Sequence, residues 1–251
     1  MIGARIMNLA ALVAALIAIG LLLSTGTRWL TQRPAFDFKR IEVRGELQHV
    51  TAASIRAAIA GRLRGNYFTV RLDETRRLLE TVPWISQAAV RRIWPNRLQV
   101  TLREHRALGA WGDGRLLSDR GELFVANIAE AEIFGPLPSF AGPAIAAAEV
   151  AARYYDFAAL VAELSLSIDG IDVSDRRSWS IQASGPGVAP TTLELGREDS
   201  AGAVHRRLAH VVAAYPMVSA RVGGPPARID ARYANGIAAS SPSSSTVPKA
   251  R

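Results

Sequence analysis

Residues 65–104 read GNYFTVRLDETRRLLETVPWISQAAVRRIWPNRLQVTLRE, and this stretch decides the fold of the first half of the chain. It predicts a helix followed by a two-stranded hairpin. Asp73 is placed to cap the helix, and Pro83 ends it because proline disfavours an α conformation at the preceding residue. Between these points one stripe of residues recurs at helical spacing: Leu72, Thr75, Leu78, Leu79 and Val82.

Strict alternation marks the hairpin. Leu98, Val100 and Leu102 alternate with polar residues, as in a half-buried antiparallel strand, and residues 87–91 alternate in the strand before it. Pro95-Asn96 supplies the turn between them. No candidate catalytic group stands at these joints, so the stretch predicts a small interaction module.

The residues upstream complete this module. Residues 36–45 (FDFKRIEVRG) predict a strand whose apolar candidates are Phe38, Ile41 and Val43, with a kink or irregularity needed to put all three inside. Thr51 is placed to cap a further helix, which ends near Gly61. The order β-α-α-β-β over residues 36–106 predicts an α+β unit with two helices on one face of a three-stranded sheet.

Composition limits the class of protein. The chain has 251 residues and is 49% hydrophobic, which suits one or two folded domains. It has no cysteine, which removes disulfides, zinc-thiolate sites and thiol nucleophiles. The net charge of +8 indicates a solvated basic face, or attraction to anionic lipid headgroups or acidic partners. Nucleic acid is disfavoured, because no aromatic stacking platform is interleaved with the arginines.

From Ile6 to Thr27 the chain carries no charge, and this segment is long enough to span a bilayer, which takes roughly 17–25 residues. Trp29 follows where an interfacial aromatic residue would lie. A cleaved signal peptide is the competing interpretation, since Arg5 precedes the segment and Ser24-Thr25-Gly26 are small. An uncleaved anchor is favoured by the length of the apolar run. Counting charges does not decide its orientation, because long domains translocate largely regardless of nearby charge.

Residues 107–239 predict a second unit rich in strands. A helix over 144–164 and a later helix, which Asp199 caps and Pro216 ends, interrupt the strands. Alternation over residues 228–233 places Ile229, Ala231 and Tyr233 on one side. Asn235-Gly236 then predicts a tight turn. From Ser240 onward the serine-rich tail has too little apolar content to be ordered.

The polar residues do not predict catalysis. His205 and His210 are five residues apart on a predicted helix, so they diverge and make a poor metal pair; His49 and His105 are isolated. Glu104 and Asp119 could be considered as the carboxylate pair of a glycan-hydrolysing enzyme. They fall on a strand end and a turn, however, without a supporting motif. We therefore expect no catalytic residue, no metal, no cofactor and no small-molecule substrate.

In its first module the chain resembles a POTRA domain, and as a whole it resembles the FtsQ/DivIB family of bacterial cell-division proteins. The resemblance covers nearly everything between the apolar segment and the serine-rich tail. Its most specific part is PWISQAAVRRIWPNRLQVTLREH, residues 83–105. Further matching pieces are FDFKRIEVRGELQHV, LLSDRGELF, PSFAGP, SWSIQ, LELGRED and RIDARYANGIA.

The resemblance implies an α+β architecture: a transmembrane helix at 6–27, a POTRA domain at 36–106, and a mixed β-sheet domain with flanking helices at 107–239. A disordered tail at 240–251 would follow. The resemblance also implies a single-pass inner-membrane protein at the division septum, with residues 1–5 cytoplasmic and the bulk of the chain periplasmic. The family is not enzymatic. Its members act as scaffolds that bind FtsB and FtsL and link early to late division proteins.

Residue by residue, the resemblance places the FtsB-binding surface on Arg232, Tyr233, Asn235, Gly236 and Ile237, with Arg197 of the LGR motif as a companion. An exposed terminal strand there would let a partner strand complete the sheet, with tyrosine and arginine as side-chain anchors. One departure is that Ala239-Ser240-Ser241 stands where the family often keeps a tryptophan. We therefore expect a shorter or differently anchored contact.

Two other classes of protein remain alternatives. A POTRA-bearing envelope chaperone for outer-membrane protein assembly or secretion usually carries tandem POTRA units or a barrel, and this chain predicts one unit and no barrel-length strand series. A cell-wall enzyme held at the membrane would need a catalytic constellation that the sequence does not show.

Overall fold

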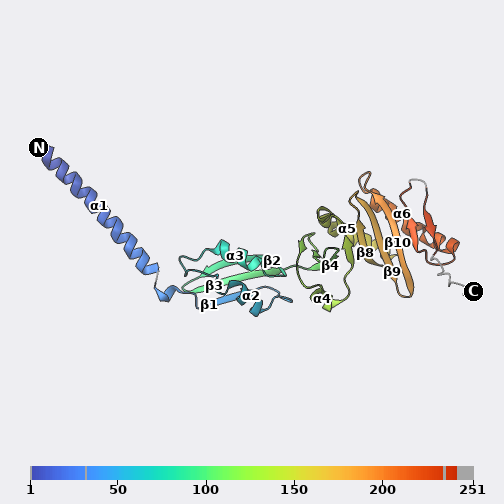
Figure 1. Cartoon of the computed structure of the whole chain (residues 1–251), viewed down its shortest axis with the longest axis horizontal. Helices are drawn as coiled ribbons and strands as arrows, with labels where there is room; N and C mark the ends of the chain where they lie inside the picture. The colour runs from blue at the N-terminus through green and yellow to red at the C-terminus, as the bar shows by residue number, and fades with distance from the viewer. Residues whose placement is uncertain (1, 32, 234–235, 242–251) are drawn as a thin grey trace, which may run out of the picture. The chain divides into compact units, whose positions relative to one another are not determined.

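The computed structural model of the chain describes residues 2–31, 33–233 and 236–241 (Figure 1). It confirms the predicted fold class, which is α+β with an N-terminal apolar helix, a β-α-α-β-β module and a larger mixed β-sheet domain with helices. Two compact units divide the chain between Glu104 and His105.

A single long helix, α1, opens the chain over Ile2–Thr31. Its segment Ala11–Trp29 has a mean hydropathy of 1.8 and is long and apolar enough to cross a membrane. The hydroxyl groups near its end donate back to helix carbonyls, as Thr25 Oγ1 does to Leu21 O at 2.8 Å. The Ser24-Thr25-Gly26 stretch therefore continues the helix with its polar side chains satisfied.

The β-α-α-β-β module has a three-stranded sheet in the order β1-β3-β2. Strand β1 runs parallel to β3, and β2 and β3 form the antiparallel hairpin. Helix α3 packs on β2 and contacts α2. The elements are η1 (Pro34–Phe36), β1 (Arg40–Arg44), α2 (Ala52–Ile59), α3 (Leu72–Glu80), β2 (Ile85–Ile93) and β3 (Arg97–Glu104).

The alternation predicted for the hairpin is confirmed. Leu98, Val100 and Leu102 are at most 3% exposed and belong to the core of the module. Gln99, on the opposite face, is also buried, and its amide oxygen accepts a 3.0 Å hydrogen bond from Arg91 Nη2. The face away from the aliphatic core is thus covered at this point by a polar pair.

Three predictions in this module are wrong. Residues 36–45 do not form one strand, because the chain around Phe36 is tied to neighbouring turns: Phe36 O accepts from Tyr67 N, and Lys39 N donates to Asn96 O. Val43 is 39% exposed on the edge strand β1. Asp73 does not cap α3; the helix begins at Leu72, so Asp73 lies in its first turn, where a negative charge favours the helix N-terminus.

The cap predicted for α2 is confirmed. Ser54 N donates to Thr51 Oγ1 at 3.2 Å, and Thr51 N donates to Ser54 Oγ at 3.1 Å. This reciprocal pair satisfies two backbone donors at the start of the helix.

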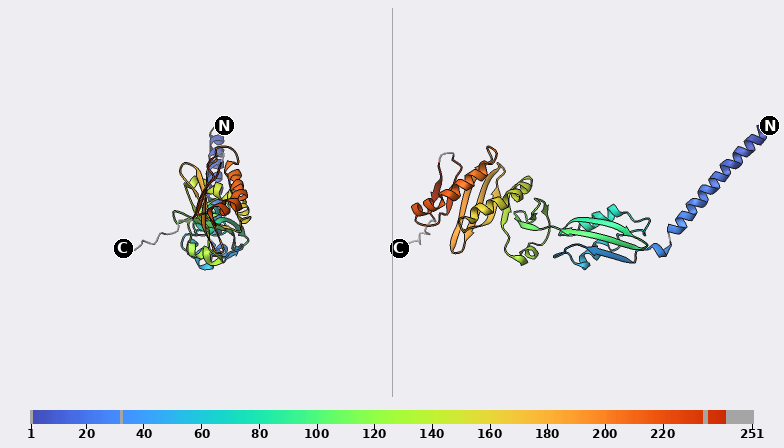
Figure 2. Two further views of the ribbon diagram at one scale, coloured as in Figure 1. Left: turned by 90° about the vertical axis from the view of Figure 1, so that its right-hand side faces the viewer. Right: turned by 180° about the vertical axis from the view of Figure 1, so that it is seen from behind.

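The second unit is a nine-stranded mixed sheet in the order β12-β11-β10-β9-β8-β7-β4-β5-β6. Helices α5 (Ala147–Ala162) and α6 (Ala203–Val222) contact each other and cover one face of it (Figures 1 and 2). The described strands are β4 (Ala107–Trp111), β5 (Leu116–Ser118), β6 (Leu123–Phe124), β7 (Ser139–Ala141), β8 (Ser167–Val173), β9 (Ser178–Gly185), β10 (Val188–Arg197), β11 (Arg228–Asp230) and β12 (Ala238–Ser240). The short helices are α4 (Ile128–Ala131), η2 (Glu132–Phe134) and η3 (Ala144–Ala146).

The predictions for both ends of α6 are wrong. Glu198, not Asp199, satisfies the start of the helix, since its carboxylate accepts hydrogen bonds from Ala203 N at 2.8 Å and Val204 N at 3.4 Å. Pro216 lies inside the helix. The apolar stripe continues beyond it to Val218, which packs against the core, and this packing offsets the backbone hydrogen bond that proline removes.

The prediction that disorder begins at Ser240 is also wrong for that residue. Ser240 ends strand β12, which pairs antiparallel with β11, and Ala227 N donates to Ser240 O at 3.0 Å. Backbone pairing of this kind needs no apolar side chain. The rest of the predicted tail, residues 242–251, lies outside the described residues.

Candidate partner-binding site

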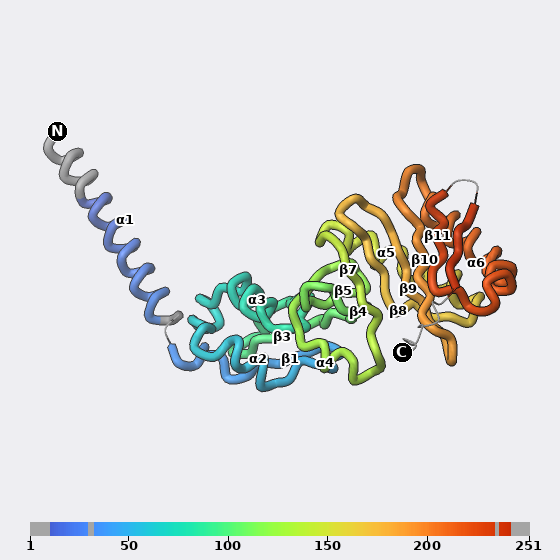
Figure 3. Tube along the Cα trace, turned by 45° about the vertical axis from the view of Figure 1, so that its right-hand side comes forward, coloured from blue at the N-terminus to red at the C-terminus, as the bar shows by residue number. Residues whose placement is uncertain are grey.

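The last three strands bring the described residues among those named by the resemblance to one border of the larger sheet. Strand β12 stands at the end of the sheet order, so within the described part of the chain its outer side pairs with no further strand. Figure 3 labels β9, β10 and β11, which lead in this order to that edge. Its three residues are all exposed, and two of them are alanines. Small side chains leave the backbone of such an edge open to another strand.

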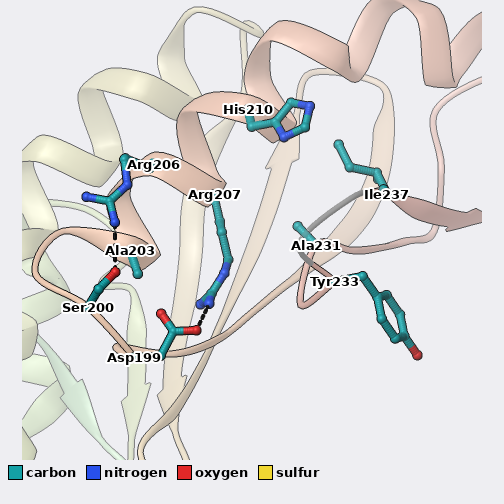
Figure 4. Close-up of a pocket in the computed structure, with 10 residues that line it drawn as sticks. Asp199, Ser200, Ala203, Arg206, Arg207, His210, Ala231, Tyr233 and Ile237 are labelled. Atoms are coloured by element: carbon teal, nitrogen blue, oxygen red, sulfur yellow. Dashed lines mark hydrogen bonds and ion pairs between the residues drawn. The ribbon is translucent and has the colours of Figure 1, made fainter.

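The alternation predicted that Tyr233 shares one side with Ile229 and Ala231, and it does not. Ile229 and Ala231 are buried, at 0% and 4% exposure, whereas Tyr233 is 64% exposed. Strand β11 ends at Asp230, so the period of two no longer applies beyond it. The ring of Tyr233 points away from the ion pair of Asp199 and Arg207 (Figure 4).

Arg232 is held by a carboxylate of its own chain. Its Nε donates to Asp230 Oδ1 at 2.9 Å, and its Nη2 donates to Asp230 Oδ2 at 2.6 Å. This hydrogen-bonded pairing outweighs burial and keeps the pKa of Asp230 below its ordinary value; the same pairing raises the pKa of Arg232. The arginine stem crosses Gly196, where an added Cβ would lie 3.1 Å from Arg232 Cγ. Glycine at this place in the LGR motif therefore gives the arginine room.

Arg197 is the exposed last residue of β10. Arg207 of α6 fixes this strand end, because its Nη1 donates to Leu195 O at 2.9 Å and to Arg197 O at 2.6 Å. Strands β10 and β11 run parallel, with Glu194 opposite Asp230 as the last register pair. Arg197 and Tyr233 each follow that pair by three residues, so they lie at the same end of the two strands.

An open groove of about 320 Å³ lies between α6 and the chain that follows β11 (Figure 4). Tyr233, Gly236 and Ile237 line it, whereas Arg197 and Arg232 do not. Asn235 lies outside the described residues. The remaining lining residues are Asp199, Ser200, Ala203, Arg206, Arg207, His210 and Ala231.

Sequence reasoning missed the contribution of α6 to this surface. Arg206 and His210 are four residues apart, a spacing that places both polar side chains on one face of a helix. That signal was available in the sequence. The sequence does not show, however, that the face lies beside the segment after β11, because the two are brought together only by the packing of α6 on the sheet.

The arrangement is suited to binding another chain. It offers an open strand edge, an exposed aromatic ring and one arginine, Arg232, whose guanidinium is held in place by Asp230. Within residues 2–31, 33–233 and 236–241, no three histidine, cysteine, aspartate or glutamate side chains gather as a metal site. Glu104, one of the two carboxylates considered for catalysis, accepts hydrogen bonds from the backbone of residues 48–50 and serves the structure of its own module.

These features define a class: an α+β protein with, among its described residues, one helix long enough to cross a membrane, a βααββ module and a larger β-domain with an open edge. Comparison with known sequences agrees with this class. The family described as "POTRA domain, FtsQ-type" matches residues 36–105, and that described as "Cell division protein FtsQ/DivIB, C-terminal" matches residues 109–232. The chain belongs to the FtsQ/DivIB family of cell division proteins.

Individual relatives are similar over most of their length. The chain is 42% identical to "Cell division protein FtsQ" of Burkholderia pseudomallei, an alignment that covers 93% of this chain and 91% of the relative. It is 36% identical to the protein of the same name from Bordetella pertussis, over 94% of this chain and 90% of the relative. A more distant relative from Coxiella burnetii is 27% identical over 90% of this chain.

Proposed function

We propose that the protein is a non-enzymatic, membrane-anchored scaffold of the bacterial divisome, which binds FtsB and FtsL and links early and late division proteins at the septum. Helix α1 is its single-pass anchor in the inner membrane, with residues 1–5 cytoplasmic and the bulk of the chain periplasmic. Residues 36–106 serve as its POTRA domain and residues 107–239 as its β-domain. Membership of the family supports this role.

The observation that carries the proposal is the open edge of β12 beside the exposed Tyr233. A strand of FtsB adds to this edge, and main-chain hydrogen bonds supply affinity while side chains supply specificity. The ring of Tyr233 offers a large contact area at a low cost in conformational entropy.

The two arginines play different parts in this binding. Arg232 is already engaged by Asp230, so a carboxylate of the partner must use its remaining donors or displace Asp230. Arg197 is exposed at the end of β10 and is the better candidate for a new bidentate pair with a partner carboxylate. Asn235, Gly236 and Ile237 complete the proposed surface.

Photo-crosslinking in dividing cells tests this proposal. A photoreactive amino acid replaces Tyr233 or Ala239 in the full-length chain, and we expect crosslinks to FtsB from both positions. Tyr155 is the matched control, since it is a tyrosine of the same unit with 61% exposure, close to the 64% of Tyr233. Equal crosslinking from position 155, or none from 233 and 239, would contradict the proposal.

A fluorescent fusion separates the scaffold from the chaperone alternative. A ring at midcell is the expected result, because a divisome scaffold gathers at the septum. A uniform envelope signal would favour a chaperone for outer-membrane protein assembly or secretion.

A further inference from the structure

Four aromatic side chains of the βααββ module pack against one another at one end of its sheet; we call them the aromatic platform (Phe36, Tyr67, Phe68 and Trp94). The ring centroids of Phe36 and Phe68 are 4.9 Å apart, and those of Tyr67 and Trp94 are 5.4 Å apart, both in edge-to-face geometry. Phe68 also lies 5.2 Å from Tyr67. The cluster therefore combines residues from three separate segments of the chain.

The platform is only half covered by the module itself. Trp94 is 61% exposed and Phe68 is 42% exposed, which is a large apolar area to leave in water. The two tryptophans that flank the hairpin differ in exposure, since Trp84 is only 3% exposed and belongs to the core. Contacts within the module therefore leave much of these two rings exposed, and a surface outside the module could cover them.

Tyr67 and Phe68 lie in a turn that hydrogen bonds to Asn66 hold in place. The side-chain oxygen of Asn66, which is buried, accepts hydrogen bonds from Phe68 N at 3.1 Å and from Thr69 N at 3.3 Å. Val70 N donates to Asn66 O at 2.9 Å, which closes the turn. Gly65 precedes it at φ +103, where a side chain would press on Thr69 Oγ1 at 2.8 Å.

All three segments meet at the end of the sheet where the chain enters the module. Tyr67 N donates to Phe36 O, and Lys39 N donates to Asn96 O in the hairpin turn beside Trp94. The chain leaves the module from Glu104, at the other end of β3. The platform therefore lies at the entry end.

Covalent connection keeps this end close to the end of α1. Phe36 follows Thr31 by five residues, and five residues reach at most about 18 Å when fully extended. This limit holds for any orientation of the helix. If α1 crosses the membrane, the aromatic platform stays within reach of the headgroup layer at every moment.

The chemistry of the entry end matches a bilayer surface. Tryptophan and tyrosine prefer the membrane–water interface, where a ring is half apolar and half hydrated, and the two phenylalanine rings add apolar surface beside them. The exposed cations Lys39 and Arg40 stand beside the hairpin turn, and anionic headgroups attract such residues.

We propose that the aromatic platform docks on the headgroup region of the membrane that α1 spans, and so holds the βααββ module against the bilayer surface. This inference rests on the membrane anchor of the proposed function. Docking at the entry end gives the module a defined height and tilt in place of free rotation about the tether.

Depth-dependent quenching in reconstituted vesicles tests the proposal. The chain has no cysteine, so single cysteines can carry a fluorescent probe on the full-length protein. Arg97→Cys reports on the entry end, and Gln87→Cys reports on the other end of the same hairpin, about 20 Å away along six residues of strand. The vesicles contain phosphatidylcholine with roughly one-third phosphatidylglycerol and a headgroup-attached nitroxide as quencher.

We expect quenching at position 97 to exceed that at position 87 by about threefold. Proximity to the tether contributes to this difference, so the decisive variant is Trp94→Ser with Phe68→Ser in the Arg97→Cys chain. It should lower quenching at position 97 well below the wild-type value, toward the level at position 87, and leave only the part that proximity to the tether contributes. Trp94→Tyr, which keeps an interfacial ring, should retain the wild-type value.

Matched controls separate docking from general effects. Val125→Ser with Ile133→Ser removes two exposed apolar side chains from the other unit and should leave quenching at position 97 unchanged. Amide exchange of β2 and β3 checks that the platform variants remain folded. Unchanged quenching in the folded Trp94→Ser, Phe68→Ser chain, or equal quenching at positions 87 and 97, would overturn the proposal.

Binding of FtsB to the same vesicles distinguishes this inference from the proposed function. The platform variants should bind FtsB as the wild-type chain does. If the wild-type chain does not bind FtsB, the scaffold proposal is contradicted and the docking proposal is unaffected. Failure of the full chain to float with vesicles would remove the anchor and overturn the docking proposal as well.

Discussion

Glu104 Oε1 accepts a 2.7 Å hydrogen bond from the backbone N–H of Val50, 54 residues earlier in the chain. The same carboxylate accepts from Gln48 N at 3.0 Å and from His49 N at 3.1 Å. Its side chain is only 8% exposed. The last residue of β3 thus fixes the loop that leads into α2, and the imidazole of His49 stacks on Trp84 beside it, with ring centroids 3.9 Å apart.

Glu104 should make the stability of the βααββ module depend on pH. Burial by itself would raise the pKa of Glu104, but the backbone donors and His49 outweigh it, so the pKa lies below its ordinary value. Because its folded pKa is depressed, Glu104 contributes its full stabilisation above the pKa of the unfolded chain, about 4.3. That stabilisation is lost as the pH falls through the folded pKa. We expect Glu104→Gln to destabilise the module by about 1–2 kcal/mol at neutral pH, and less below about pH 4.

Amide exchange of α2 and β3 in the full chain measures this difference across the pH range. Glu46→Gln is the control, since Glu46 is exposed in the same loop. The same protection in both variants at neutral pH would show that the Glu104 carboxylate adds nothing to stability.

Leu98→Ala should destabilise the βααββ module by about 2–5 kcal/mol, because Leu98 is fully buried and the cavity left behind cannot close completely. Val43→Ala is the matched control on the adjacent strand; with 39% of Val43 exposed, the cost should stay below about 1 kcal/mol. Urea unfolding followed by amide exchange of each unit checks both values. A cost of equal size for the two variants would contradict the assignment of the core.

Gly109→Ala should disturb the start of the β-domain. A Cβ there would lie 2.3 Å from Phe140 Cε2 and 2.5 Å from Pro138 O, and neither the buried ring nor the backbone carbonyl can move away easily. We expect a loss of about 1–3 kcal/mol, as for other overpacked cores. Gly112→Ala, whose Cβ would meet its nearest neighbour, Ala141 Cβ, at an ordinary contact distance of 3.5 Å, should change stability by less than about 0.5 kcal/mol. Thermal unfolding of the two variants, side by side, measures the contrast.

Tyr233→Ala should weaken binding of FtsB by roughly 2 kcal/mol or more, as truncation of an interface hot spot does. Titration of the full-length chain in detergent with purified FtsB gives the affinity. Tyr155→Ala removes an equally exposed tyrosine from α5 and should bind as the wild-type chain does. Wild-type affinity in the Tyr233→Ala chain would refute the role given to this ring.

Local chemistry in the sequence determined much of the first module. The alternation of Leu98, Val100 and Leu102 and the capping residue Thr51 act over a few residues, so a reader of the sequence can place them. The motif-level resemblance led to the family in the same way. Some local predictions failed because a neighbouring residue took the predicted role. Glu198, and not Asp199, accepts the hydrogen bond from the backbone at the start of α6.

Only the tertiary structure decided which surfaces the protein presents. Tyr233 is exposed because β11 ends at Asp230, and Arg232 is held because Asp230 lies within reach of its guanidinium. The aromatic platform exists because three distant segments meet at one end of a sheet. Periodicity encodes how each segment buries its own apolar face. Which segments then become neighbours depends on packing between them, and that long-range choice is what leaves an edge, a ring or a cluster open to a partner.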